Sequence, residues 1–200
     1  MGTTGLDFSD IYDEFHEKLH RYLERMIGKN DAEDVTQEVF VKIGNGLKDF
    51  KGKSSISTWV YRIATNAALD RMKCRSFRED NKTMMLNNIS KESEAGNICL
   101  EEKSLSAERQ AIRNEMNECI REFVDRLPTD YKTVIILSEI KDLKNRQIAD
   151  ILGISLDAVK IRLHRARIRL KAEFEAGCDF YHDEDGGFAC DRKKSEKNDQ

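Results

Sequence analysis

The sequence predicts an all-α protein made of two small helical domains joined by a flexible linker. Apolar residues recur at helical spacing through most of the chain, and the only proline, Pro128, leaves long helices uninterrupted. No alternation of apolar and polar residues persists long enough to build a sheet. A chain of 200 residues has room for two small domains.

The first predicted domain covers residues 6–78 and contains three helices. In order, they run from Leu6 to Met26, from an N-cap at Asp31 to Gly44, and from an N-cap at Ser57 to Phe77. Gly28 and Asn30 separate the first two helices, and the polar segment 45–57 forms the loop before the third.

The second predicted domain covers residues 106–175. Its helices run from Ser106 to Arg126, Tyr131 to Ile140, Arg146 to Leu152, and Leu156 to Glu175. Residues 79–105 have weak periodicity and many Asn, Ser, Lys and Glu residues, which indicates a linker. Residues 176–200 form a charged C-terminal tail that contains cysteines.

The last two helices of this domain form a helix-turn-helix, with Gly153 in the turn. The second of them has an apolar side at Val159, Leu163, Ala166 and Leu170, and it has no acidic residue between Lys160 and Lys171. A helix of this kind places its first turn against base edges in the major groove, while basic residues further along hold phosphates. The alternative is a plain three-helix core, but the segregated charge favours DNA binding.

A second informative stretch, residues 50–75, interleaves aromatic and basic residues. Aromatic faces stack on unpaired bases and cations follow the backbone, so this composition is typical of single-strand binding. The alternative is that Trp59 and Tyr61 are buried in a helical core. Aromatic residues at helical spacing usually serve packing, so this stretch taken alone favours the buried core.

Composition excludes several other classes of protein. The net charge of −3 excludes a uniformly basic nucleic-acid binder, and no apolar run approaches the ~18 residues of a membrane span. The N-terminus lacks a signal-peptide pattern, so we expect a cytoplasmic protein whose five cysteines are reduced thiols. We expect no cofactor and no enzymatic activity, because no His-Glu cluster, nucleophile elbow or phosphate-binding glycine loop is present.

Taken together, the two stretches resemble the extracytoplasmic-function (ECF) sigma factors of bacterial RNA polymerase. The resemblance rests on DAEDVTQEVFVKI and FKGKSSISTWVYRIATNAALDRMK in the first domain, and on LPTDYKTVIILSEIKDLKNRQIADILGISLDAVKIRLHRARIRLK in the second. The resemblance covers most of residues 8–174. The linker resembles that of the family only in being polar. The resemblance implies binding to core RNA polymerase and to promoter DNA, control by an anti-sigma factor, and no covalent chemistry by the chain itself.

The resemblance also assigns three sets of residues. Those expected on the polymerase clamp are Asp34, Gln37, Glu38, Phe40, Val41 and Lys42. Those expected at the minus-ten element, where a base is flipped out of the non-template strand, are Phe50, Lys53, Ser54, Ser57, Trp59, Arg62, Asn66, Asp70 and Arg71. Those expected at the minus-thirty-five element are Ser155, Asp157, Ala158, Lys160, Ile161, Arg162, His164 and Arg165.

The chain departs from the family pattern in its helix-turn-helix. Gln147 stands where the family usually has Glu, and a Thr-Val-Lys-Ser run is replaced by residues 158–161, Ala-Val-Lys-Ile. The loss of two hydroxyls removes possible bonds to DNA, while Ile161 offers contact with a thymine methyl. The base preference of the helix therefore stays open.

Two other readings of the chain stay open at this point. An ordinary helix-turn-helix regulator would bind duplex DNA without polymerase, although the clamp-like helix and the Trp59–Arg75 helix argue against it. In the tail, Cys178, His182 and Cys190 are weak candidates for a metal or redox site, against the alternative of a flexible tail with ordinary thiols.

Overall fold

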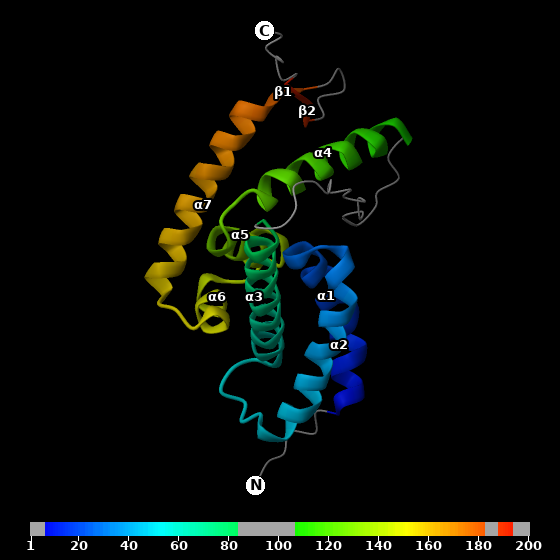
Figure 1. Cartoon of the computed structure of the whole chain (residues 1–200), viewed down its shortest axis with the longest axis vertical. Helices are drawn as coiled ribbons and strands as arrows, with labels where there is room; N and C mark the ends of the chain where they lie inside the picture. Colours follow the sequence, from blue (N-terminus) through cyan, green and yellow to red (C-terminus); the bar gives the residue numbers. More distant parts are fainter. Residues whose placement is uncertain (1–6, 84–106, 183–187, 194–200) are drawn as a thin grey trace. The chain divides into compact units, whose positions relative to one another are not determined.

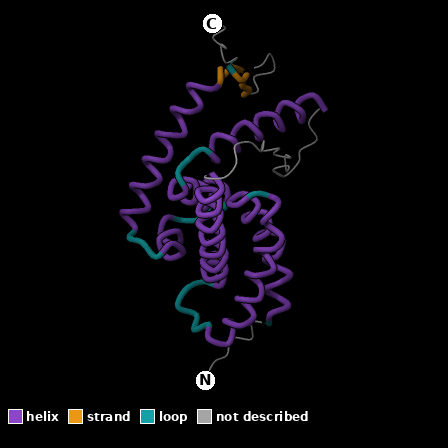
Figure 2. Tube along the Cα trace, in the orientation of Figure 1, coloured by secondary structure: helices purple, strands orange, loops and turns teal. Residues whose placement is uncertain are grey.

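The computed structural model describes residues 7–83, 107–182 and 188–193, and it divides into two compact units. Unit 1 contains Met1–Lys91 and Ile136–Lys160, and unit 2 contains Glu92–Ile135 and Ile161–Gln200, apart from the undescribed residues in those ranges. The described part is almost entirely helical, with a two-stranded hairpin near the C-terminus (Figures 1 and 2).

Unit 1 is built on three helices, α1 (Phe8–Ile27), α2 (Lys29–Gly46) and α3 (Ile56–Thr83), with a short 3-10 turn, η1 (Leu47–Asp49), after α2. They pack because each carries apolar residues at helical spacing, which gives the fully buried set Leu19, Leu23, Val35, Val39, Ile43, Val60, Ala64 and Ala68. Inside this core, the Tyr22 hydroxyl lies 2.8 Å from the Thr65 hydroxyl, so the polar end of Tyr22 is satisfied although the ring is buried.

Several predicted helix boundaries in unit 1 were wrong. Helix α2 begins directly after Gly28, so Asp31 lies in its first turn instead of capping it, and the helix continues past Gly44. A glycine inside a helix lowers its stability by about 1 kcal/mol, but it marks the end of the helix only where it adopts a positive φ. Helix α3 begins earlier than predicted, because the Ser55 hydroxyl, not Ser57, accepts the Thr58 N–H at 3.1 Å.

The end of α3 also differs from the prediction. The helix extends to Thr83, so residues 79–83 of the predicted linker are helical, and the remainder of that linker lies outside the described residues. Residues 79–83 read Glu-Asp-Asn-Lys-Thr and contain no apolar residue, so hydrophobic periodicity cannot reveal such an extension.

The second segment of unit 1 comprises a π-helical turn, η2 (Ile136–Ile140), α6 (Asn145–Leu152), and the first residues of α7 (Leu156–Gly177). The predicted helix from Tyr131 to Ile140 is thus an α-helix only up to Ile135. Lys141, just after η2, donates to the Lys18 carbonyl at 3.2 Å. Burial, and then the nearby Arg21 and Arg25, lower the pKa of Lys141 to about 8.

Unit 2 contains α4 (Ala107–Asp125), α5 (Thr129–Ile135), the remainder of α7 and the antiparallel strands β1 (Cys178–His182) and β2 (Phe188–Arg192). Pro128 lies between α4 and α5, as its missing N–H and its effect on the preceding residue predict. The expectation of no sheet was wrong in the tail, because β1 and β2 pair as an antiparallel hairpin with Cys178 opposite Arg192 and Phe180 opposite Cys190.

Candidate nucleic-acid interface

The loop before α3 gathers aromatic side chains at the surface of unit 1. The rings of Phe50 and Trp59 lie 5.1 Å apart, and both side chains are half-buried. Gly46 makes room for the indole, since a Cβ there would lie 3.1 Å from the Trp59 ring. Lys53 is exposed beside them and Gly52, with φ of 65°, allows the sharp turn of the loop.

Tyr61, also considered for base stacking, is instead part of the core. Its ring packs edge-on against Tyr22 at 5.3 Å, and burial raises its pKa to about 12. The structure therefore divides the aromatic stretch: Tyr61 is explained by packing, whereas Phe50 and Trp59 remain at the edge, where part of each ring meets solvent.

The other predicted minus-ten residues take different positions. Asn66 and Asp70 are exposed on α3, while Ser54 and Ser57 are half-buried in and after the loop. Arg62 is half-buried, and its Nε donates to the Asp150 carbonyl of α6 at 2.9 Å within unit 1. In this conformation the Arg62 guanidinium is thus already engaged by protein.

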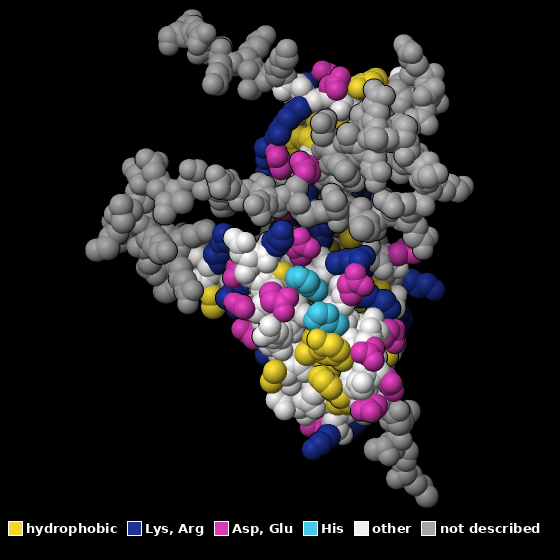
Figure 3. Space-filling view, turned by 90° about the vertical axis from the view of Figure 1, so that its right-hand side faces the viewer, with side chains coloured by type: hydrophobic (Ala, Val, Ile, Leu, Met, Phe, Trp, Pro, Cys, Tyr) yellow, Lys and Arg dark blue, Asp and Glu magenta, His cyan; other side chains and the backbone are white. Residues whose placement is uncertain are grey.

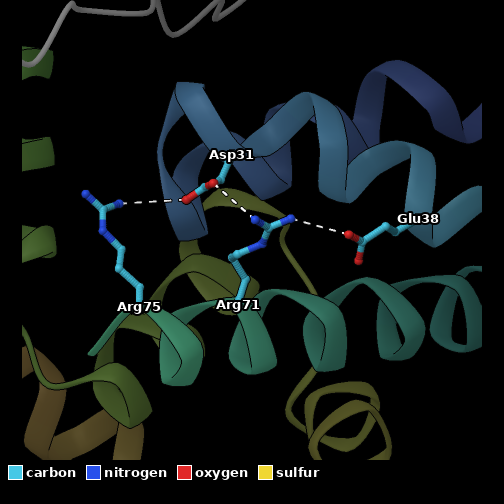
Figure 4. A network of polar contacts seen from close by, with 4 residues as sticks. All are labelled: Asp31, Glu38, Arg71 and Arg75. Carbon is cyan, nitrogen blue, oxygen red and sulfur yellow. Dashed lines mark hydrogen bonds and ion pairs between the residues drawn. The ribbon is translucent and has the colours of Figure 1, made fainter. Parts of the chain in front are cut away.

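Four charged residues link α2 to α3 in one network (Figure 4). Arg71 contacts Asp31 at 3.5 Å and Glu38 at 3.3 Å, and Arg75 reaches the other oxygen of Asp31 at 3.8 Å. Glu38 was expected on polymerase and Arg71 on DNA, yet here they bind each other. The sequence assigned neither Asp31 nor Arg75 to a binding site, so only the packing of α2 on α3 reveals the network.

The outer side of α2 presents most of the predicted clamp residues to solvent. Exposed residues there are Asp34, Gln37, Glu38, Val41 and Lys42, and Val41 is 63% exposed. Phe40 is an exception: it is only 5% exposed, because Tyr12 and His16 of α1 cover it with ring centroids at 4.8 and 5.6 Å.

Beside this surface lies an aromatic patch that the sequence did not reveal. Phe8 and Tyr12 of α1 are about two-fifths exposed and flank Phe40. Figure 3 shows hydrophobic side chains gathered next to histidines on this side of the molecule. Helical periodicity placed the buried residues of α1, but Phe8 and Tyr12 fall outside that buried stripe.

The turn of the helix-turn-helix is set by local hydrogen bonds. Gly153 adopts a left-handed φ of 64° at the end of α6, and the Ser155 hydroxyl accepts the Ala158 N–H at 3.1 Å, which caps α7. At the start of α6, Gln147 Oε1 accepts the Lys144 N–H at 3.0 Å. Gln and Glu both carry a side-chain oxygen that can accept this hydrogen bond. The helix cap is therefore preserved although Gln147 replaces the usual Glu.

Along α7, the predicted minus-thirty-five residues fall into two groups. Ala158 lies in the first turn, and the exposed residues are Asp157, Lys160, Ile161, His164 and Arg165, with Ile161 51% exposed. Lys160 pairs with Asp157 at 3.3 Å on the same helix. Arg162 is half-buried and its guanidinium lies 3.0 Å from Asp130 near the start of α5. In this structure the Arg162 guanidinium is thus engaged by Asp130, while its expected DNA contact stays a prediction.

In the tail, the described residues contain no group of three or more His, Cys, Asp or Glu side chains that could hold a metal ion. Cys178 is buried, Cys190 is half-buried and His182 is exposed. The sequence did not predict that Cys119 of α4 approaches the tail, with its Sγ 3.5 Å from that of Cys178.

The chain matches two family models, Sigma-70 region 2 over residues 11–78 and Sigma-70 region 4 over residues 117–170. It is 30% identical to the ECF RNA polymerase sigma factor SigW of Bacillus subtilis, over 83% of this chain and 88% of that protein. It is 34% identical to the RNA polymerase sigma factor YlaC of the same organism, over 81% and 88% of the respective chains.

Solved structures agree in fold. The chain resembles the sigma factor RpoE of Bartonella quintana, solved in complex with the anti-sigma factor NepR, with a TM-score of 0.65 at 19% identity over 84% of this chain and 97% of that one. It also resembles CnrH, solved in complex with the cytosolic domain of CnrY, with a TM-score of 0.58 at 24% identity over 84% and 88%.

The three helices of the region 2 match and the helix-turn-helix of the region 4 match define a two-region transcription initiation factor. The chain belongs to the ECF sigma factor family. Within the described residues, no helix is long and apolar enough to cross a membrane.

Proposed function

We propose that this sigma factor binds core RNA polymerase through α2, opens the minus-ten element with α3 and the loop before it, and reads the minus-thirty-five element with α7. The observation that carries the proposal is the agreement between the family matches and the surfaces: residues 11–78 include the exposed side of α2 and the Phe50–Trp59 edge, and residues 117–170 include the exposed first turns of α7.

The division of labour follows from the exposed chemistry. Mixed charge and the apolar Val41 on α2 suit a protein partner, because protein interfaces combine apolar contact with a polar rim. Phe50 and Trp59 beside Lys53 suit an unpaired base, whose extrusion costs a few kcal/mol that stacking and cationic contacts offset. The predicted domain boundaries at residues 78, 105 and 175 are kept as part of this proposal.

We further infer that the chain catalyses no covalent step, acts in the cytoplasm together with polymerase, and is held inactive by an anti-sigma factor. The fold neighbour RpoE was solved with an anti-sigma factor, and the exposed apolar side chains of Phe8, Tyr12 and Val41 are a surface that such a protein partner would cover. Core polymerase and anti-sigma factor would then compete for one side of α1 and α2.

Transcription in vitro tests the function directly. Core polymerase with this chain should start RNA synthesis at a small set of sites on genomic fragments, and core polymerase alone should not. A gel shift without polymerase separates the rival regulator: a regulator binds duplex DNA tightly on its own, whereas a sigma factor binds it weakly. Tight, specific binding by the chain alone, together with no stimulation of polymerase, would contradict the proposal.

Replacing Lys53 and Ser54 together by alanine should lower open-complex formation by about three- to tenfold while leaving closed-complex binding nearly unchanged. The physical reason is that only the open state presents an unpaired strand to this loop. Permanganate footprinting measures the open complex, and filter binding measures the closed one. Lys48→Ala, at an exposed lysine of η1 outside the loop, serves as the control. Equal losses in both states would assign the loop to duplex phosphates.

A further inference from the structure

The C-terminal hairpin brings a cluster of thiols together against α4. Cys119 Sγ lies 3.5 Å from Cys178 Sγ, and Cys178 also interacts with Cys190 through its side chain. Cys178 is 3% exposed and lies between the other two, which are half-buried. The cluster joins residues from α4, β1 and β2, although Cys119 and Cys178 are 59 positions apart in sequence.

Contacts other than sulfur hold the hairpin in this position. Arg192 of β2 lies 2.5 Å from Glu122 of α4, and the Lys193 N–H donates to the Gly177 carbonyl at 2.9 Å. The Phe123 ring lies so close to Gly177 that a Cβ there would approach it to 2.5 Å. Phe174 packs edge-on against Phe123 at 5.1 Å. The two sulfur atoms are therefore held near each other by the surrounding fold.

We infer that Cys119 and Cys178 are a modification site that forms a reversible disulfide, which joins α4 to β1. The oxidant class is a low-molecular-weight disulfide. A protein thiolate attacks it and releases one small thiol, and the second protein thiolate then displaces the other. One protein S–S bond forms, two protein S–H bonds are lost, and the oxidant disulfide is reduced to two thiols.

The geometry selects Cys119 over Cys190 as the partner of Cys178. Cys178 faces Arg192 in the hairpin register, so Cys190 is its diagonal neighbour. The Cα atoms of diagonal residues in an antiparallel pair of strands are about 7–8 Å apart. Disulfides span Cα distances of about 4.4–6.8 Å, so a Cys178–Cys190 bond would strain the hairpin. Cys119 meets Cys178 from another element and is not subject to this restriction.

The same surroundings slow the reaction at neutral pH. Burial, and then the hydrogen bond with Cys178, raise the pKa of Cys119 to about 11; Glu122 adds to this rise and Arg192 of β2 opposes it. Burial, and then the nearby Cys119 and Asp191, also raise the pKa of Cys190. Because the thiolate is the nucleophile, the rate of oxidation should increase by about tenfold per pH unit between pH 7 and pH 9.

The disulfide would close a large segment of the protein. Residues 119–178 contain α5, α6 and the whole of α7, including the exposed residues proposed to read DNA. A crosslink across so long a segment stabilises the folded state chiefly by restricting the unfolded chain. We therefore expect the midpoint of thermal unfolding to rise by about 5 °C or more on oxidation.

The test uses the full, reduced chain and oxidised glutathione as the probe. After oxidation at pH 7, 8 and 9, free thiols are alkylated and the peptides are mapped by mass spectrometry. The expected product is a Cys119–Cys178 crosslinked peptide that dithiothreitol removes, with a rate that rises with pH. A Cys178–Cys190 crosslink, or glutathione that remains attached at Cys119, would overturn the inference.

Matched variants separate the pair from the other thiols. Cys119→Ser and Cys119→Ala should each abolish the crosslink, and circular dichroism verifies that at least one of them keeps its fold. Cys190→Ser, and Cys74→Ser at an exposed cysteine, should leave the crosslink in place. A rise of the unfolding midpoint on oxidation that persists in Cys119→Ala, or a midpoint that does not rise when the crosslink is present in the unsubstituted chain, would refute the proposal.

Discussion

Replacing Asp34 and Glu38 together by lysine is expected to weaken binding to core RNA polymerase by about tenfold to a hundredfold. Both carboxylates lie on the exposed side of α2, in the segment that matches Sigma-70 region 2. Reversing two charges at a complementary surface replaces attraction by repulsion, which costs about 1–3 kcal/mol at partly exposed positions. Affinity measured by fluorescence anisotropy with labelled sigma factor gives the result.

Glu38 needs a separate measurement because it also contacts Arg71. Exposed ion pairs contribute about 0–1 kcal/mol, so the fold should survive the reversal. Glu38→Gln removes the pair with Arg71 without reversing charge and should lower polymerase affinity much less. Asp10→Lys with Asp13→Lys, at exposed positions of α1, is the matched control for a general charge effect. Unchanged affinity in a folded Asp34/Glu38 double variant would exclude this surface from the interface.

Replacing Arg165 by alanine is expected to relax the base preference at one position of the minus-thirty-five element, with a loss of about 1–3 kcal/mol of discrimination. Arg165 is exposed and lies one helical turn after Ile161 on α7, where we propose that its long cationic side chain would reach base edges. Lys160→Ala should have a smaller effect, because Asp157 already neutralises part of its charge at 3.3 Å. Selection from a library randomised at this element reads out both changes.

Two control positions on the same helix distinguish base contact from other roles. Arg169→Ala, at an exposed residue further along α7, should weaken all sequences alike and lower the salt slope by about one. Arg162→Ala should lower stability while the selected motif stays the same, because its guanidinium binds Asp130 at 3.0 Å. If Arg165→Ala and Lys160→Ala both leave the motif intact, the proposed reading side of α7 is wrong.

The sequence predicted the helices with buried sides well, and the reason is periodicity. Helices α1, α6 and α7 begin and end within a few residues of the prediction, because apolar spacing, the Ser155 cap and Gly153 act locally. The prediction missed both ends of α3, where the local sequence signals are weaker. Ser55 caps α3 instead of Ser57, and α3 continues to Thr83 although residues 79–83 contain no apolar residue to mark the extension.

The candidate site shows the same division between local and long-range information. The motifs identified the segments that carry the function, but they could not tell which side chains are free. Phe40 is covered by Tyr12 and His16, and Tyr61 packs on Tyr22, since aromatic residues near a core are buried whenever neighbouring helices provide a surface. The Arg71 network with Asp31 and Glu38 joins residues about 33–40 positions apart, which no local pattern reveals.

The sequence by itself determined the fold class and the family resemblance that the comparisons confirm, because helical periodicity and a basic helix after a glycine turn are local properties of the chain. Only the tertiary structure decided which residues of each motif remain exposed, that the tail forms a hairpin, and that Cys119 meets Cys178. These outcomes depend on contacts between segments far apart in sequence. Their free energy comes from burial and pairing that exist only once the helices have packed.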